Sequence, residues 1–105
     1  MPYYMHQWVY KDSQIRKIVM ESDKRWEVVR IAVDAFGGKL HQFFFCLGDF
    51  DAVSISEFAD DETALGCLMA IVAQGGVAVM KSVQLLTEEE AHRAIRRANQ
   101  ILTKK

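Results

Sequence analysis

Three side chains in the first half of the chain belong to the types that polarise or deprotonate a bound molecule. They are His6, Tyr10 and His41. A histidine titrates near neutral pH, so its imidazole serves as a general base or as a hydrogen-bonding contact for a ligand. Isolated histidines on an aromatic surface are also typical of hydrogen-bonded core residues. The three residues are therefore catalytic candidates only if they line a common cavity.

A second group of candidates lies around the segment Gly48-Asp49-Phe50-Asp51. Residues two apart project to the same side of an extended chain, so the carboxylates of Asp49 and Asp51 can meet one ligand or cation. The alternative is a turn, in which Gly supplies a positive φ and Asp accepts hydrogen bonds from nearby NH groups. Together with Trp8, the residues Asp49, Phe50 and Asp51 are the expected ligand-binding set.

The sequence contains none of the common patterns that hold a metal or a cofactor. Cys46 and Cys67 are too far apart for a CxxC motif, and the histidines show no HxH or HxxxH spacing. A glycine-rich phosphate loop and a nucleophile elbow are also missing. We therefore expect no metal and no cofactor, and we expect both cysteines to be free thiols in a reducing cytoplasm.

The overall composition indicates one folded domain over residues 1–105. Half of the residues are hydrophobic and 26% are charged, a balance that excludes intrinsic disorder. Thirteen basic against fourteen acidic residues leave a net charge of −1, which argues against a nucleic-acid partner. The longest apolar run is far shorter than the ~20 residues of a membrane span, and no secretory signal is visible. We therefore expect a cytoplasmic protein that binds neither nucleic acid nor membrane.

Four strands are expected where apolar and polar side chains alternate, or where β-branched and aromatic residues run together. They cover residues 3–10, 39–47, 52–58 and 77–86. The segment 15–20 indicates no more than a short helical turn. These strands are the elements that must position the candidate side chains, because most of the candidates lie on them or beside them.

The first full helix is expected to begin at Ser22, which is a plausible N-cap, with Asp23 in the favourable first turn. It ends at Gly37-Gly38, because glycine takes the left-handed conformation that a helix C-terminus prefers. Its apolar face is expected to carry Trp26, Val28, Val29, Ala32, Val33, Ala35 and Phe36.

Two further helices are expected in the second half of the chain. Asp60 or Asp61 caps one of them. Thr87 and Glu90 form a capping box, which predicts a C-terminal helix over about 88–103. The side chains expected to point inward from the first of these helices are Leu65, Leu68, Met69 and Val72. Those expected on one face of the second are Ala91, Ile95, Ala98 and Leu102.

The resulting order, β-α-β-β-α-β followed by a helix, is the split βαβ or ferredoxin-like arrangement of the α+β class. Right-handed crossovers place both helices of such a fold on one face of a four-stranded antiparallel sheet. The opposite face then has no helix to cover it, although the strands carry apolar residues on both sides.

A second copy of the chain is expected to cover this face, packed sheet to sheet through a two-fold axis. Large apolar side chains left in water would otherwise cost about 1.5–3 kcal/mol each relative to burial. The alternative is that the C-terminal helix folds over the same face. The residues expected on the uncovered face are Tyr4, His6, Trp8, Tyr10, His41, Phe43 and Phe45.

Three short segments, in this order, resemble the GYD-domain family. They are Gly37-Gly38-Lys39, Gly48-Asp49-Phe50-Asp51-Ala52-Val53 and Gly76-Val77, and the resemblance extends over about residues 10–90. It implies the dimeric α/β-barrel assembly but no catalytic residue. Gln14 stands where the family often has a glycine. A more distant similarity to the effector-binding domain of Lrp/AsnC-type regulators implies a small ligand at subunit contacts.

Three functions remain open at this point. The first is a homo-oligomeric module that binds a small molecule or a protein partner near the sheet-to-sheet interface. The second is a metal-independent enzyme of the dimeric α/β-barrel type, an isomerase or a monooxygenase, in which His6, Tyr10 or His41 polarises the substrate. The third is a structural protein without a ligand. The first two require an open cavity lined by these residues, whereas in the third their side chains fill it.

Overall fold

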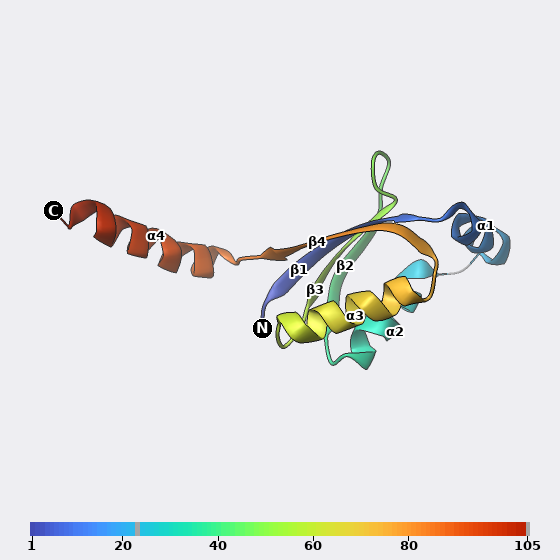
Figure 1. The fold of residues 1–105 in the computed structure, drawn as a ribbon, viewed down its shortest axis with the longest axis horizontal. Helices are drawn as coiled ribbons and strands as arrows, with labels where there is room; N and C mark the ends of the chain where they lie inside the picture. The colour runs from blue at the N-terminus through green and yellow to red at the C-terminus, as the bar shows by residue number, and fades with distance from the viewer. Residues whose placement is uncertain (23, 105) are drawn as a thin grey trace.

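The computed structural model describes residues 1–22 and 24–104, which form one four-stranded antiparallel sheet and four helices (Figure 1). The order of the strands across the sheet is β2-β3-β1-β4. This confirms the expected ferredoxin-like α+β fold. The strands are β1 (Tyr3–Tyr10), β2 (Lys39–Phe45), β3 (Ala52–Glu57) and β4 (Val77–Leu85). The helices are α1 (Asp12–Glu21), α2 (Arg25–Ala35), α3 (Asp61–Ala73) and α4 (Glu88–Thr103).

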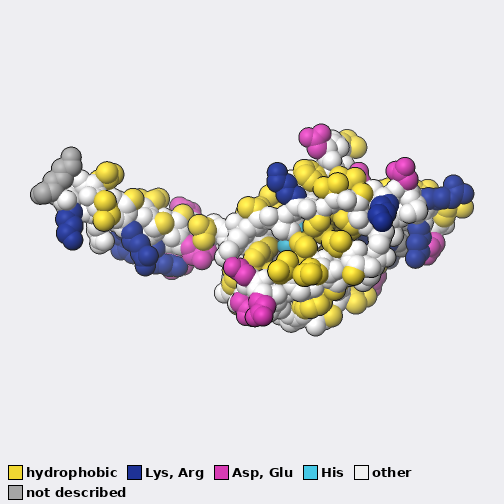
Figure 2. All heavy atoms as spheres, in the orientation of Figure 1, with side chains coloured by type: hydrophobic (Ala, Val, Ile, Leu, Met, Phe, Trp, Pro, Cys, Tyr) yellow, Lys and Arg dark blue, Asp and Glu magenta, His cyan; other side chains and the backbone are white. Residues whose placement is uncertain are grey.

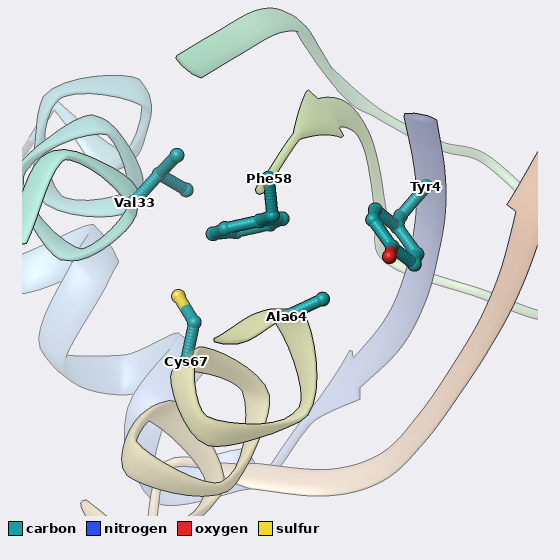
Figure 3. Close-up of a cluster of buried hydrophobic side chains, with 5 residues drawn as sticks. All are labelled: Tyr4, Val33, Phe58, Ala64 and Cys67. Atoms are coloured by element: carbon teal, nitrogen blue, oxygen red, sulfur yellow. The ribbon is translucent and has the colours of Figure 1, made fainter. Parts of the chain in front are cut away.

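Helices α2 and α3 cover one face of the sheet, as Figure 1 shows. The core between these two layers includes a cluster of five buried side chains, drawn in Figure 3: Tyr4, Val33, Phe58, Ala64 and Cys67. A second cluster contains Trp8, Tyr10 and Ala52. The Tyr4 hydroxyl also donates a hydrogen bond of 2.5 Å to Asp61 Oδ1, which ties β1 to the start of α3.

The aromatic side chains of β1 therefore face the helices, and the prediction that they lie on the uncovered face is wrong. Tyr4, Trp8 and Tyr10 are all buried within the chain itself. An alternating strand has two faces, but alternation alone does not say which face meets the helices. The large rings fill the space beneath the helices because β3 presents only Ala52, Ser54 and Ser56, all buried, on that side.

The predicted faces of β2 are also wrong for part of the strand, because a register shift lies between Leu40 and Gln42. Leu40 pairs with Ser56, and Phe43 pairs with Ser54. Both apolar side chains therefore lie on the helix side, whereas strict alternation placed them on opposite faces. One extra residue in a strand reverses the alternation beyond it.

The segment before α2 contains a complete helix instead of the predicted turn. α1 spans ten residues, and Ser22 follows it in the left-handed conformation with φ 51°. Ser22 thus caps the C-terminus of α1, which corrects its predicted role as the N-cap of the next helix. α2 begins at Arg25. The predicted helical position of Asp23 lies outside the described residues.

Helix α3 buries its small side chains, which corrects most of its predicted inward face. Ala64 and Cys67 are buried, and Leu68 and Ile71 are partly buried beside them. Apolar residues occur on nearly every side of this helix, so the 3.6-residue period does not identify the inward face. The predicted inward residues that are exposed instead are Leu65, Met69 and Val72.

The turn after α2 explains the glycine pair of the family-like motif. Gly37 has φ +69°, the left-handed conformation that ends a helix. A Cβ atom on Gly38 would lie 2.6 Å from the ring of Phe58 and 2.8 Å from the carbonyl oxygen of Glu57. Gly38 is therefore needed because a fully buried aromatic ring packs directly against its backbone.

The second face of the sheet, which we call the open face, is bare among the described residues (Figure 1). Phe44, Val79 and Val83 on this face are 56%, 52% and 45% exposed. The cross-strand pairing places the remaining apolar residues of the open face on the same side: Met5, Val9, Val53, Ile55 and Leu85. Apolar residues do line an uncovered face, but they are largely different ones from those predicted.

Helix α4 extends away from the sheet and does not fold over the open face (Figure 1). Its predicted capping box is present, because Glu90 N donates to Thr87 Oγ1 and Thr87 N donates to Glu90 Oε1. Figure 2 shows hydrophobic side chains along one side of α4 and Lys and Arg along the other. No helix of the described chain is long and apolar enough to cross a membrane.

Candidate ligand cavity

A partly enclosed cavity of about 90 Å³ lies between the covered face of the sheet and helices α2 and α3. Apolar side chains make most of its wall. Those from the sheet include Trp8, Val77 and Met80, and those from the helices include Val29, Ala32, Val33, Leu68 and Ile71.

The cavity exists because small residues face one another across the two layers. Ser54 in the centre of β3 and Ala32 on α2 both line it. A larger residue at either position would occupy the same space. Buried cavities of this kind are uncommon in close-packed protein interiors, and those that persist are often binding sites.

His6 is one of the titratable side chains that line the cavity. It projects from β1, and its Nδ1 atom lies 2.6 Å from the Ser82 hydroxyl oxygen on the neighbouring strand. Burial lowers the pKa of His6 below its ordinary 6.5. The imidazole is therefore neutral at pH 7, with one ring nitrogen engaged by Ser82 and a ring surface available to the cavity.

Polar groups also gather where β1, β4 and α3 end or begin. Gln14, Arg25 and Gln74 line this end of the cavity together with the aromatic ring of Tyr10. The Arg25 guanidinium carbon lies 5.8 Å from the centre of that ring, a cation–π contact. Gly76 completes this end, and its carbonyl oxygen accepts a hydrogen bond of 2.9 Å from Lys11 N. A positive charge thus stands at the polar end of an otherwise apolar cavity.

His41 does not join the other two catalytic candidates. It lies on the opposite side of the sheet, where its ring stacks on Tyr3 at a centroid distance of 5.1 Å. His41 Nε2 lies 2.9 Å from Glu57 Oε1. The structure therefore brings His6 and Tyr10 to one cavity and leaves His41 outside it.

The loop between β2 and β3 uses its acidic residues to hold the sheet. Asp51 Oδ2 accepts a hydrogen bond of 2.9 Å from Tyr10 N, and Asp51 N donates to Trp8 O at 2.9 Å. Asp49 is exposed, and Phe50 is half-buried. Of the predicted ligand-binding set, only Trp8 lines the cavity. The geometry of Asp51 is that of a turn residue that locks the register of β1.

The thiols and carboxylates of the described chain form no evident metal site. No group of three or more His, Cys, Asp or Glu side chains within residues 1–22 and 24–104 is arranged to hold an ion. The Cys67 thiol lines the cavity, but burial raises its pKa to about 11, which keeps it protonated and unreactive at neutral pH.

Several lining residues were not singled out by the sequence patterns. The sequence does contain a pattern that points to Ser54, since the alternation Ala52, Ser54, Ser56 places three small residues on one face of a strand. No sequence pattern points to the three polar residues at the end of the cavity, because they come from separate segments that only the fold brings together: Gln14, Arg25 and Gln74. Such an arrangement can bind a compact apolar molecule that carries one polar group.

Several solved structures share this fold at low sequence identity. TTHA0845 from Thermus thermophilus is 11% identical, with a TM-score of 0.57, and the match covers 83% of this chain and 95% of that one. A transcriptional regulator from Neisseria meningitidis, solved as an L-Met complex, is 15% identical with a TM-score of 0.56. This match covers 83% of the chain but 51% of the regulator. These similarities show a common fold, and a comparison with curated proteins finds no significant match.

A family model identifies the chain more specifically. The GYD-domain model matches residues 4–95, which include β1 from Tyr4 onward, β2 to β4, helices α1 to α3 and the first half of α4. The matched region contains the glycine pair before β2, the Gly-Asp-Phe-Asp loop before β3 and the glycine before β4. The chain belongs to the GYD-domain family.

Proposed function

We propose that the protein is a homodimeric module that binds a small, mainly apolar molecule in the cavity between the sheet and helices α2 and α3. The observation that carries this proposal is the cavity itself, whose apolar walls surround the neutral imidazole of His6 and end at Gln14, Arg25 and Gln74. Apolar walls with a few convergent polar groups are the usual composition of a small-molecule site.

The size and charge of the cavity restrict the ligand. An apolar cavity of about 150 Å³ is enough to bind benzene. The cavity described here is smaller, about 90 Å³ including its polar end, so a ligand of that size would also extend out of its open side. A polar group on the ligand would meet the side-chain amides of Gln14 and Gln74 at the polar end. The L-Met complex of the Neisseria regulator supports a small-molecule role for this fold.

The homodimer is supported by the open face. Phe44, Val79 and Val83 are apolar side chains of the open face that are exposed to solvent. A sheet-to-sheet contact through a two-fold axis would bury them. The ligand is then expected on the helix side of each protomer, away from the contact between the sheets.

A metal-independent enzyme is the second candidate, and the state of His6 favours it. A general base must be unprotonated at the working pH, and burial keeps the pKa of His6 below 6.5. Tyr10 lines the same cavity. In an enzyme, His6→Gln would abolish turnover of a substrate that the variant still binds, whereas in a binding module the same variant would change affinity alone.

The binding proposal is tested by calorimetric titration and thermal shift with indole, benzoate and L-methionine as probes. We expect at least one probe to bind the wild-type chain. Ala32→Leu places a larger side chain in the cavity and is expected to abolish this binding, while Ala35→Leu, an equal change on the exposed side of α2, leaves it intact. Binding that survives Ala32→Leu, or no binding of any probe, would contradict the proposal.

A further inference from the structure

The chain exposes far more surface than a compact monomer of its mass. Its accessible surface is 7568 Å², whereas a folded monomer of 12.0 kDa exposes about 6,000 Å². Its radius of gyration is 17.0 Å, against about 13 Å for a compact chain of this length. The excess of about 1,600 Å² exceeds the ~800 Å² that each partner contributes to a standard protein interface.

The segment Leu86–Lys104, which we call the arm, extends away from the rest of the chain (Figure 1). It contains α4, whose 16 residues span about 24 Å. The apolar stripe of the arm consists of Ala91, Ile95, Ala98 and Leu102, with Ile95 62% and Leu102 73% exposed. Within the described residues no helix or strand packs extensively against α4. A helix of this length is marginal in water unless its apolar face is buried.

The arm leaves the sheet beside the open face, and α4 points away from its own sheet (Figure 1). Only Leu86 and Thr87 separate β4 from α4, and the capping box holds the first turn of the helix. Leu85 at the end of β4 belongs to the open face, so the arm begins where that face ends. A second copy that covers the open face is therefore the molecule nearest to the apolar stripe.

The charge of the arm is opposite to that of residues 1–87, which we call the body. This favours the body of a second copy as the surface on which the arm docks. Residues 1–87 hold eight basic and eleven acidic side chains, a net charge of −3. Residues 88–105 hold five basic and three acidic ones, a net charge of +2, with the acidic residues in the first turn of α4. The basic part of the arm thus projects away from its own acidic body. Two arms side by side would instead bring their arginines together.

We propose that the arm docks through its apolar stripe on the body of a second copy of this chain, so that the two protomers of the homodimer exchange their C-terminal helices. The proposal rests on the homodimer proposed above and adds a second contact to it. A reciprocal exchange closes through a two-fold axis and leaves no stripe unpaired. The second half of α4 lies beyond the family match, which ends at residue 95.

The test places a photo-crosslinking amino acid, p-benzoylphenylalanine, in the full-length chain at Leu102 on the apolar stripe or at Gln100 on the polar side of α4. Mixed light and ¹⁵N-labelled chains distinguish products between chains from those within one chain. We expect light–heavy dimers from position 102 and few from position 100. Products confined to one chain, or no preference for position 102, would overturn the proposal.

Sedimentation of substituted chains measures the contribution of the stripe. The double variant Ile95→Glu/Leu102→Glu is expected to raise the dimer Kd about a hundredfold or more, since each buried Ile or Leu contributes roughly tenfold or more to binding. His92→Glu/Gln100→Glu adds the same charge to the polar side and is expected to change the Kd less than about threefold.

The outcomes separate the arm from the sheet contact. If the dimer persists in Ile95→Glu/Leu102→Glu but dissociates in Val83→Glu, the proposed arm contact is contradicted and the sheet contact is supported. If the dimer dissociates in Ile95→Glu/Leu102→Glu but persists in Val83→Glu, the arm contact is supported and the sheet contact is contradicted. A wild-type chain that is monomeric overturns both, and flotation with phosphatidylcholine–phosphatidylglycerol vesicles then tests a lipid surface as the occupant of the stripe. Probe binding in the cavity is measured independently of all three results.

Discussion

The imidazole of His6 sits between the cavity and the Ser82 hydroxyl, where burial disfavours its charged form. The pKa of His6 is lowered in the folded chain, so the unfolded chain takes up a proton first as the pH falls. The stability that neutral His6 contributes is complete above pH 6.5. It is lost as the pH falls from 6.5 through the folded-state pKa.

His6→Gln removes this titration while keeping a polar side chain that can bind Ser82. We expect the wild type to lose stability relative to His6→Gln as the pH is lowered from about 7.5 to about 5, because only the wild type has the shifted histidine. Urea unfolding at a series of pH values measures the difference. Parallel pH profiles of the two proteins would show that His6 is not held neutral by the fold.

Asp51 is the residue of the Gly-Asp-Phe-Asp loop with the largest expected effect on stability. Its carboxylate accepts a hydrogen bond from the partly buried backbone amide of Tyr10, and Asp51→Ala removes that hydrogen bond. The expected cost is about 1–3 kcal/mol of unfolding free energy. Asp49→Ala, two residues away and exposed, is expected to change stability by less than about 0.5 kcal/mol.

Denaturant unfolding measures both aspartate variants, and probe titration separates stability from binding. Because neither Asp49 nor Asp51 lines the cavity, the affinity of a cavity-bound probe is expected to stay the same in each folded variant. A loss of binding in Asp49→Ala with unchanged stability would instead assign the loop a direct role in the ligand site.

Among the elements, α4 is the one whose stability depends most on its own sequence, because no helix or strand of the described chain packs extensively against it. Three features favour the helix: the capping box, the glutamates in its first turn and the alanines on its stripe. The hydrogen bond from Thr87 N to the Glu90 carboxylate lowers the pKa of Glu90. The cap is therefore a charged interaction at neutral pH and weakens in acid.

Thr87→Ala removes the N-cap and is expected to cost α4 about 1 kcal/mol, which corresponds to about fivefold faster amide exchange in its first turns. Thr103→Ala at the other end of the helix is the matched control, since Thr103 Oγ1 bonds only to carbonyl groups of the last turn. Hydrogen exchange measures the two variants. Equal effects at both ends would mean that the capping box does not hold the helix.

For the whole molecule, the two faces of the sheet differ in whether helices of the same chain cover them. α2 and α3 cover one face, while the other retains exposed apolar side chains that the chain does not bury. We propose that the covered face binds the ligand in its cavity, and that the open face and the arm provide the surfaces for association.

Val83→Glu places a carboxylate in the open face and is expected to raise the dimer Kd tenfold or more, since burial of a valine contributes about 1.5–3 kcal/mol and the charge adds a desolvation cost. Gln84→Glu, the next residue on the opposite face of β4, introduces the same group and is expected to have little effect. Light scattering across a dilution series measures both. A dimer insensitive to Val83→Glu would exclude the open face from the interface.

The order of the elements was predictable from the sequence because each is set by contacts between near neighbours. The capping box of α4, the glycines after α2 and the alternation of β1 all depend on residues a few positions apart. The family resemblance rested on the same local segments. Helix α1 was the exception, because the sequence predicted only a short turn there. Its end was missed because the sequence does not distinguish a serine in a left-handed turn from a serine that acts as an N-cap, and Ser22 is the former.

The face on which each side chain lies was decided by the tertiary structure. Alternation in β1 defines two sets of residues, but the volume left by Ala52, Ser54 and Ser56 on the neighbouring strand selects the aromatic set for the covered side. The register shift in β2 likewise depends on pairing with β3. The sequence by itself determined the family and every element except α1, since local hydrogen bonding and backbone preference suffice for these. Only packing between distant segments decided the cavity and the position of His41 outside it.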